Sequence, residues 1–491
     1  MSSAALGALL FSSCAVGPNY KRPEVSTPTA FKRATPTEKA QPVVSKTWWT
    51  EFKDPQLNQL AEQTIAANQD IQAGIARVEE ARAALRTVRG DYFPSINLNP
   101  SMRRGRSAGT GFSATGISSG GTDTSNGNGN GNGNGNGNTS GSSNRGRIST
   151  SYSLPLVLNY EFDIWGRLRR QAEAARANEI ASESDLEFVR QTAIADVATA
   201  YFSIRLYDTQ IDIYQRSLEL YRRQLELTQT KLKAGLALQT DVLQAQTQVN
   251  SGTAQVLEVQ RARAKEEHAI AILLGKAPSE FSLDSKNLPL TIPTIPAGVP
   301  ASLLNQRPDV AVAEARLAAA NAQVGVATAA FYPTFSLTGS AGFESSRYQN
   351  LTDWANHVWS IGPGISLPIF QGGSLYGTLQ QRRATYRELV ANYRTAVLTA
   401  YRDVEDQLSD LHLLAQKAEV LDATLASARE YSRLTELQYR QGITTYLQVI
   451  DANQTLLTNE LSAAQAQNQR LTATVLLVKA LGGGWENTAK L

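Results

Sequence analysis

Few residues of this chain could carry bond-making chemistry. It has one cysteine, Cys14, and three scattered histidines, His268, His357 and His412. A protein zinc site needs Cys, His or carboxylate ligands at short spacing, and covalent catalysis needs a nucleophile beside a base. The sequence offers neither arrangement and no phosphate-binding P-loop, so it argues against a metal site, a cofactor, an enzyme and an intrachain disulfide.

One segment matches a hydrolase motif by its letters alone. Residues 116–120 have the pattern G-x-S-x-G, in which a strand-to-helix turn presents a nucleophilic serine. Here the pattern lies in a run of Gly, Ser, Thr and Asn at residues 107–144, whose centre alternates Asn and Gly at residues 126–138. Such a composition cannot bury a core, so we expect a flexible loop and no nucleophile.

The chemistry that Cys14 does indicate is lipidation. Residues 1–13 are small and apolar and end at this cysteine, as a lipoprotein signal peptide ends at its processing site. No Lys or Arg precedes the apolar run, which favours a start codon further upstream. The alternative, a cysteine buried as a small hydrophobic residue, is less favoured because the chain after Cys14 is polar and rich in proline.

Composition narrows the class of protein further. The chain has 47 Lys and Arg against 44 Asp and Glu in 491 residues, so it offers no clustered basic face for nucleic acid. No run of 18 apolar residues occurs, which excludes an α-helical membrane span. If the chain crosses a membrane, it must do so as strands.

The elements that would position any site are arranged twice along the chain. The matched positions of the two halves are Asp70 with Asp309, Pro94 with Pro333, Gly166 with Gly372, Tyr201 with Tyr401, and Gly235 with Gly442. The offset falls from 239 to 206 residues because the first half carries the loop at residues 107–144. Similarity in a fixed order indicates duplicated architecture.

Each half contains two segments that alternate between apolar and polar residues, at residues 95–103, 148–164, 334–344 and 359–369. Such segments are about as long as the 9 to 11 residues that cross a bilayer obliquely, although a soluble sheet with one wet face has the same pattern. We therefore expect four strands per chain.

Each half also contains a very long helix, at residues 167–234 and 374–440, which favours the membrane alternative. Apolar positions step by three and four, as in a coiled coil: Ile211, Tyr214, Leu218, Tyr221, Leu225, Thr228 and Leu232 in the first helix, and Val397, Tyr401, Val404, Leu408, Leu411, Ala415 and Ala418 in the second. Each helix would be about 100 Å long and would turn at a glycine into a returning helix that ends near Gly275 or Gly482. Four strands cannot close a barrel in lipid, so the chain must oligomerise, and two copies would supply 8 strands where three would supply 12.

Three segments then identify a family resemblance: CAVGPNYKRP at residues 14–23, NQRPDV at residues 305–310, and YLQVIDA at residues 446–452. With them the chain resembles the lipoprotein branch of the TolC-like outer-membrane efflux factors (OprM/NodT type). The resemblance implies an α+β membrane protein that forms a homotrimer, in which four β-strands per chain build a 12-stranded outer-membrane β-barrel and the coiled-coil helices build a periplasmic α-barrel.

The resemblance also implies the function and the partners. The trimer would be the exit duct of a tripartite multidrug efflux pump, passively conducting small molecules after docking of a periplasmic adaptor (membrane fusion protein) and an inner-membrane RND-type pump. It would be lipid-anchored in the outer membrane, extend into the periplasm and bind no nucleic acid. Two alternatives remain: a type I protein-secretion duct, and a periplasmic coiled-coil adaptor, which would have only one hairpin.

The site residues implied by the resemblance lie at the two helix reversals. The tip segments that receive the adaptor are Ala234, Gly235 and Leu236 in the first half and Gln441, Gly442 and Ile443 in the second. The residues that hold the entrance shut are Thr240, Asp241 and Tyr439, with Gln448 and Asp451 at positions of acidic rings. The arginine that TolC has two residues after its second tip glycine is Thr444 here, so Arg440 is a candidate for the missing cation.

The expected organisation along the chain is a signal peptide at residues 1–13, an extended anchored segment at 14–55, repeat one at 56–275, a proline-rich linker at 276–300, repeat two at 301–481 and a tail at 482–491. The loop at residues 107–144 would lie outside the cell. It is framed by five arginines that either meet lipopolysaccharide phosphates or form a plain solvated rim: Arg103, Arg104, Arg106, Arg145 and Arg147.

Overall fold

The computed structural model describes residues 15–32, 45–106, 148–289, 291–293, 295 and 303–486. These form two units, one of helices and one of strands, and the strand unit is built from the described residues of 90–164 and 332–369. Cys14, the segment before it, the Asn/Gly tract, Arg145 and Arg147 lie outside the described residues.

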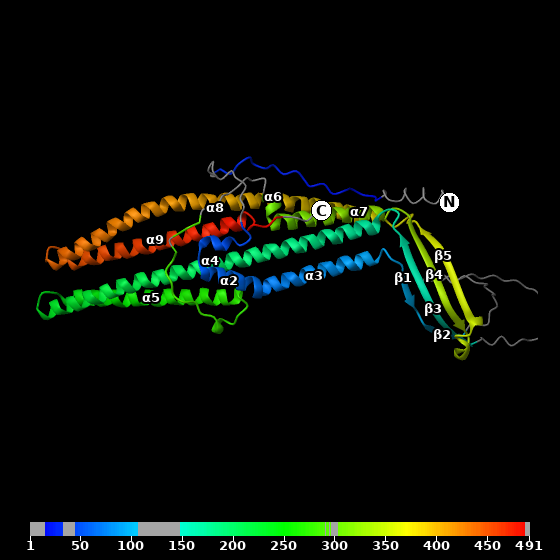
Figure 1. Ribbon diagram of the computed structural model, residues 1–491, viewed down its shortest axis with the longest axis horizontal. Coiled ribbons are helices and arrows are strands. Elements are labelled where there is room, and N and C mark those ends of the chain that lie inside the picture. Colours follow the sequence, from blue (N-terminus) through cyan, green and yellow to red (C-terminus); the bar gives the residue numbers. More distant parts are fainter. Residues whose placement is uncertain are drawn as a thin grey trace, which may run out of the picture. The chain divides into compact units, whose positions relative to one another are not determined.

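The helical unit consists of the same helices twice, which confirms the predicted repeat (Figure 1). The equivalent pairs are α3 (Gln69–Gly90) and α7 (Pro308–Ala329), of 22 residues each; α4 (Arg167–Lys233) and α8 (Ser374–Arg440), of 67; and α5 (Gln239–Leu273) and α9 (Tyr446–Ala480), of 35. Shorter elements are η2 (Trp48–Phe52), α2 (Pro55–Ala67), η3 (Pro278–Glu280) and α6 (Leu303–Gln306). No helix in the described part of the chain is both long and apolar enough to span a membrane.

Two of the predicted pairings between the halves are wrong by a small shift. Gly166 and Gly373, not Gly372, are the residues that precede α4 and α8, both in the left-handed region. With α4 and α8 aligned from these ends, Tyr201 is one heptad out of register with Tyr401. A coiled-coil pattern repeats every seven residues or so, so a shift of one heptad preserves the apolar match.

The first predicted coiled-coil stripe is confirmed, since Leu218, Tyr221 and Thr228 are buried. The second is correct at every predicted position except Ala415, since the last position, Ala418, is half-buried. Ala415 is exposed, whereas Leu414 is half-buried, so the stripe takes one step of three where the sequence predicted four. An α-helix has about 3.6 residues per turn, so a straight helix cannot hold a repeat of 3.5 indefinitely.

The strand unit is one antiparallel sheet. Its strands are β1 (Ser95–Leu98), β2 (Ser101–Arg106), β3 (Ile148–Phe162), β4 (Thr334–Ser345) and β5 (His357–Ser366). Both β1 and β2 pair with β3 in a single register, and β4 and β5 follow in that order. They are therefore one strand interrupted at Pro100, which has no N–H for the ladder, and the prediction of four strands is confirmed. Pro368, which also lacks an N–H, lies just beyond the end of β5, so the fourth strand does not reach Ile369 as predicted.

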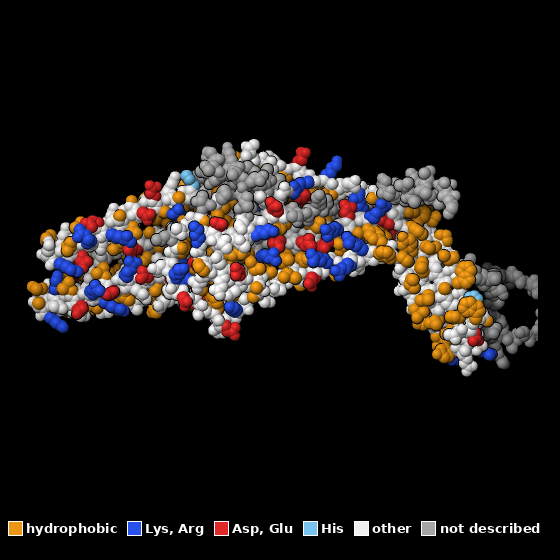
Figure 2. All heavy atoms as spheres, in the orientation of Figure 1, with side chains coloured by type: hydrophobic (Ala, Val, Ile, Leu, Met, Phe, Trp, Pro, Cys, Tyr) orange, Lys and Arg blue, Asp and Glu red, His pale blue; other side chains and the backbone are white. Residues whose placement is uncertain are grey.

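The sheet has one apolar and one polar face, because directly paired residues of antiparallel strands share a face. The apolar face carries Met102, Leu154, Leu156, Leu158, Tyr160, Phe335, Leu337, Phe343, Ile361 and Ile365. The polar face carries Ser153, Asn159, Glu161, Ser336, Thr338, Ser340 and Ser360. Figure 2 shows apolar side chains gathered over the sheet, and Ile361 and Ile365 are 66% and 70% exposed. Nothing in the described chain covers this face.

Residues 15–32 lie extended against the helical unit. The Val16 N–H donates to the Trp165 carbonyl at 2.9 Å, and a Cβ added to Gly17 would lie 2.6 Å from Cα of Gly325. Further along, Arg22 pairs with the buried carboxylate of Glu314. The Gly-Pro-x-Tyr motif therefore positions a segment that packs along α4 and α7.

Candidate functional site

Both long helices reverse direction at a glycine, as predicted. Gly235 and Gly442 have φ of 74° and 77°, a region that side chains with a Cβ rarely adopt. The N–H of the residue after each glycine donates back to a carbonyl five residues earlier, from Leu236 to Lys231 and from Ile443 to Gln438, at 2.8 and 2.9 Å. These bonds cap the ends of α4 and α8 as Schellman motifs.

The tips expose aliphatic side chains. Leu236 and Ile443 are 78% and 70% exposed, and their neighbours Ala234 and Gln441 are also exposed. An exposed large aliphatic residue at the same position of both hairpins costs solvation without stabilising either hairpin. Such a pair of residues suits a partner that covers them.

The two hairpins contact each other just behind these tips. The Lys231 ammonium of α4 lies over the ring of Tyr439 on α8, with Nζ 3.9 Å from the ring centroid. That ring in turn lies 5.8 Å from the ring of Tyr446 on α9. Tyr446 packs with Ala245 and Ile450, so elements of both halves share one small apolar cluster.

The predicted gate residues are only partly brought together. Tyr439 is in the contact between the hairpins, and Asp241 lies close enough to Tyr446 to affect its titration. The Asp241 carboxylate accepts the Leu238 N–H at 3.1 Å and thus caps the start of α5. Thr240 is exposed, and among the described residues no hydrogen bond joins it to Tyr439.

Burial and the charge of neighbouring groups make Tyr446 a weak acid. Burial is the larger cause and the nearby Tyr439 and Tyr221 hydroxyls and Asp241 carboxylate add to it, which raises the pKa of Tyr446 to about 12. The Tyr446 phenol is therefore neutral at physiological pH.

Gln448 and Asp451 lie on one exposed face of α9, as their spacing predicted. The Tyr431 hydroxyl donates to Oδ2 of Asp451 at 3.4 Å, a long bond, and the described structure has no ion pair at Asp451. Arg440, the candidate cation, instead pairs with Glu436 on its own helix at 2.5 Å. The cation at Tyr439 is Lys231, which the sequence prediction missed although it lies only four residues before Gly235.

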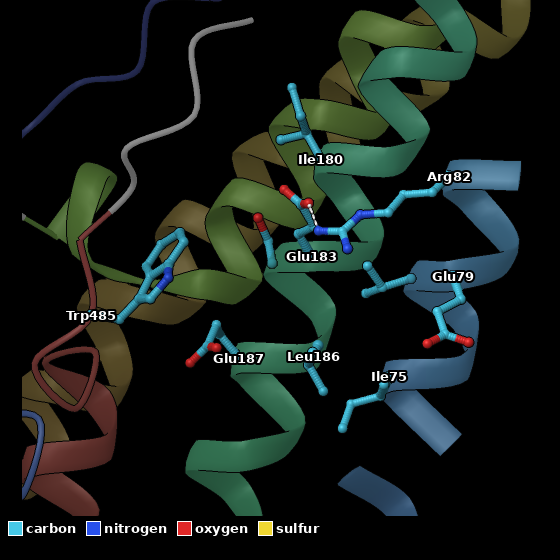
Figure 3. Close-up of a pocket in the computed structure, with 10 residues that line it drawn as sticks. Ile75, Glu79, Arg82, Ile180, Glu183, Leu186, Glu187 and Trp485 are labelled. Carbon is cyan, nitrogen blue, oxygen red and sulfur yellow. Dashed lines mark hydrogen bonds and ion pairs between the residues drawn. The ribbon is translucent and has the colours of Figure 1, made fainter. Parts of the chain in front are cut away.

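A groove of about 350 Å³ separates α3 from α4 (Figure 3). Figure 3 shows Arg82 reaching from α3 toward Glu183 of α4, and the two groups are 2.8 Å apart. The apolar side chain of Ile75 also lines the groove and is 36% exposed. The groove is a helix interface that is only partly filled.

Neither the tips nor the groove forms a reaction centre. Within the described residues no group of three or more His, Cys, Asp or Glu could hold a metal ion. The three histidines lie on α5, at the start of β5 and on α8.

Comparisons with known proteins agree with this architecture. The family model described as "Outer membrane efflux protein" matches residues 60–276 and 299–483. The solvent efflux pump outer membrane protein SrpC of Pseudomonas putida is 32% identical over 435 residues, which are 88% of this chain and 86% of that protein. The outer membrane protein OprJ of Pseudomonas aeruginosa is 29% identical, covering 100% and 97%.

Solved channels have the same fold. The outer-membrane channel OprN superposes with a TM-score of 0.85 at 30% identity, covering 96% of this chain and 100% of that one. The Campylobacter jejuni channel CmeC superposes with a TM-score of 0.87 at 23% identity, covering 97% and 96%. With long paired helices, four antiparallel strands and a family match over most of its length, the chain belongs to the outer membrane efflux protein family, a family of non-enzymatic channels, and is the outer-membrane channel component of an efflux pump.

Proposed function

We propose that the chain works as a homotrimeric exit duct that is closed at its helical tips and opened when a periplasmic adaptor and an inner-membrane RND-type pump dock there. The observation that carries this proposal is the contact between Lys231 and Tyr439, which ties one hairpin to the other directly behind two exposed aliphatic tips. A docking partner that covers Leu236 and Ile443 would act on the residues next to this contact.

Two features support a trimer. The sheet has open edges at β1, β2 and β5, whose unpaired N–H and C=O groups would cost several kcal/mol each in lipid, so neighbouring copies must pair with them. The partly filled groove beside α3 offers a second surface for a neighbouring copy. Three copies of a four-stranded sheet would give the 12-stranded barrel that the family resemblance implies.

The gate would be an electrostatic and aromatic clasp. A lysine over a tyrosine ring contributes about 0.5–2 kcal/mol, depending on its solvation. Three such contacts in a trimer would hold the tips together and yet remain weak enough for a docking protein to break. Asp451, with its unpaired charge, and Gln448 would line the constriction beyond the clasp and make it attract cations.

The chain would be lipid-anchored at Cys14. Residues 15–32 support this role because they lie against α4 and α7, so an acyl group at Cys14 would be tied directly to the helical unit. Anchoring by more than one acyl chain is stable in a bilayer. The cargo would be small apolar or amphiphilic molecules, since SrpC is named a solvent efflux pump protein.

Single-channel conductance in planar bilayers tests the clasp. Lys231→Met removes the cation and keeps the length of the side chain, so we expect the closed-state conductance to rise at least about twofold. Lys231→Arg, which restores the cation, should return it to the original value. Lys233→Met, which removes an exposed lysine two residues away, is the matched control and should leave the closed-state conductance unchanged. Equal conductance of the unaltered protein and Lys231→Met would refute the clasp.

A further inference from the structure

The apolar face of the sheet ends in a cleft at the strand ends that do not lead into helices. The cleft has a volume of about 740 Å³, and its apolar lining includes Met102, Tyr152, Leu154, Tyr348 and Leu351. This volume is within the range of sites that bind small molecules or parts of larger ones.

The segment between β4 and β5 forms one wall of this cleft. It contains the short helices η5 (Tyr348–Asn350) and η6 (Trp354–Asn356). The ring of Tyr348 packs edge-on against Tyr152 of β3, with centroids 5.8 Å apart. Tyr152 pairs with Met102 of β2 in the ladder, so both residues lie on the apolar face.

Two arginines follow Met102 on the same face. Arg104 pairs with Thr150 and Arg106 with Ile148, so both share the face of Met102 and Tyr152. A strand rises about 3.4 Å per residue, which places their Cα atoms roughly 7 and 14 Å beyond that of Met102. All residues of β2 are exposed, and neither guanidinium has an ion pair with the described part of the chain.

The other charges at this rim leave the arginine pair unbalanced. Arg347, two residues after β4, adds a further positive charge. Glu344 pairs with Ser153 and therefore lies on the polar face, which leaves Asp353 as the acid of the described β4–β5 segment. Trp354 and Trp359, at the same rim, are 77% and 71% exposed, as is typical of tryptophan at a membrane–water interface.

An apolar cleft below unpaired guanidinium groups matches the chemistry of an anionic amphiphile. Arginine binds phosphate through two parallel N–H donors, and an acyl chain gains free energy by leaving water. We propose that this site binds the phosphorylated glycolipid of the outer leaflet, lipopolysaccharide, with an acyl chain in the cleft and a headgroup phosphate on Arg104 and Arg106. The proposal rests on the proposed function in one respect, that the apolar face of the sheet contacts lipid.

Binding of purified bisphosphorylated lipid A to the full-length protein in nanodiscs of zwitterionic phospholipid tests the site. The double variant Arg104→Gln and Arg106→Gln should weaken binding at least about tenfold, because both charge-assisted phosphate contacts are lost. Arg103→Gln is the matched control on the same strand, since Arg103 pairs with Ser151 and lies on the polar face. The affinity of Arg103→Gln for lipid A should stay within about twofold of that of the unaltered protein.

Two further probes identify the ligand chemistry. Lipid A without phosphates should bind the unaltered protein weakly. Its affinity should be no higher than that of bisphosphorylated lipid A for the double variant. Phosphatidylglycerol, an anionic phospholipid, should compete weakly. Equal weakening by Arg103→Gln, or competition by phosphatidylglycerol as strong as that of lipid A, would overturn the proposal.

Conductance separates this inference from the proposed function. The double variant should conduct as the unaltered protein does, because the arginines are remote in sequence and structural unit from the helix tips. Arginine-dependent lipid binding by a protein without channel conductance would leave this site standing and refute the duct. A protein that conducts, but whose lipid binding does not depend on Arg104 and Arg106, would support the duct and refute this lipid site.

Discussion

Gly17 lies so close to Gly325 that a side chain on Gly17 would clash with the backbone of α7. A Cβ on Gly17 would be 2.6 Å from Cα of Gly325, and a Cβ on Gly325 would be 2.9 Å from Cγ of Arg170. Arg170 in turn donates to the Asn19 side chain at 2.6 Å. This three-layer contact between residues 15–32, α7 and α4 explains why the motif at the start of the segment begins with glycine.

Gly17→Ala should therefore loosen the N-terminal segment. Gly17 has φ of 96°, so alanine would meet both backbone strain and a backbone clash, at a cost of about 1–3 kcal/mol. We expect faster trypsin cleavage after Lys21, followed by mass spectrometry. Gly90→Ala, where the added Cβ would meet nothing within 4 Å, is the control. Unchanged cleavage in Gly17→Ala would show that the segment is held elsewhere.

Arg307 should be a stabilising residue of repeat two. Its buried guanidinium contacts Asp309 at 2.6 Å, Asp403 of α8 at 3.2 Å and the Ala480 carbonyl of α9 at 3.1 Å. Arg307→Met leaves the Ala480 carbonyl and the partly exposed Asp309 without their buried donor, which lowers the free energy of unfolding by about 1–3 kcal/mol. A urea titration measures this change.

The control for Arg307 is its exposed counterpart. Arg402 also contacts Asp403, at 2.9 Å, but its side chain is 66% exposed. Arg402→Met should therefore change the free energy of unfolding by less than about 1 kcal/mol, because water screens exposed pairs. If Arg307→Met and Arg402→Met lowered the free energy of unfolding by similar amounts, burial would not be what makes the Arg307 contacts stabilising.

Asp451→Asn should lower the cation preference of the channel. An uncompensated carboxylate near the axis of a trimer attracts cations and repels anions. The reversal potential in a salt gradient should move toward zero in Asp451→Asn, and Gln448→Glu, which adds an acid on the same face, should move it the other way. Asp422→Asn on α8 is the exposed control. If neither Asp451→Asn nor Gln448→Glu changed the reversal potential, this face of α9 would lie away from the axis.

Cys14→Ala should abolish metabolic labelling with a palmitate analogue. The loss of an acyl anchor removes about 0.8 kcal/mol per buried CH₂ group of membrane affinity. Because the proposed barrel would also hold the protein in the membrane, transport should fall only in part. Persistent labelling would show that another residue is modified.

The sequence by itself determined the local architecture. Periodicity of three and four residues predicted α4 and α8 to within one residue, and left-handed Gly235 and Gly442 stand where the helices turn. Alternation predicted which strand residues share a face. These features depend on neighbours within a few residues along the chain, which is the range that a pattern of residue types reports.

Only the tertiary structure decided which distant residues meet. Lys231 and Tyr439 are separated by about 200 residues, and Gly17 and Gly325 by about 300, so no spacing in the sequence could pair them. The choice between Arg440 and Lys231 as the cation at Tyr439 has the same origin. Both lie in the last turn of a long helix, and Arg440 has an acid one turn before it on its own helix, whereas α4 presents Lys231 to the neighbouring hairpin. The packing of one hairpin against the other selects the cation, because a cation–π contact forms only where the ammonium lies over the ring face.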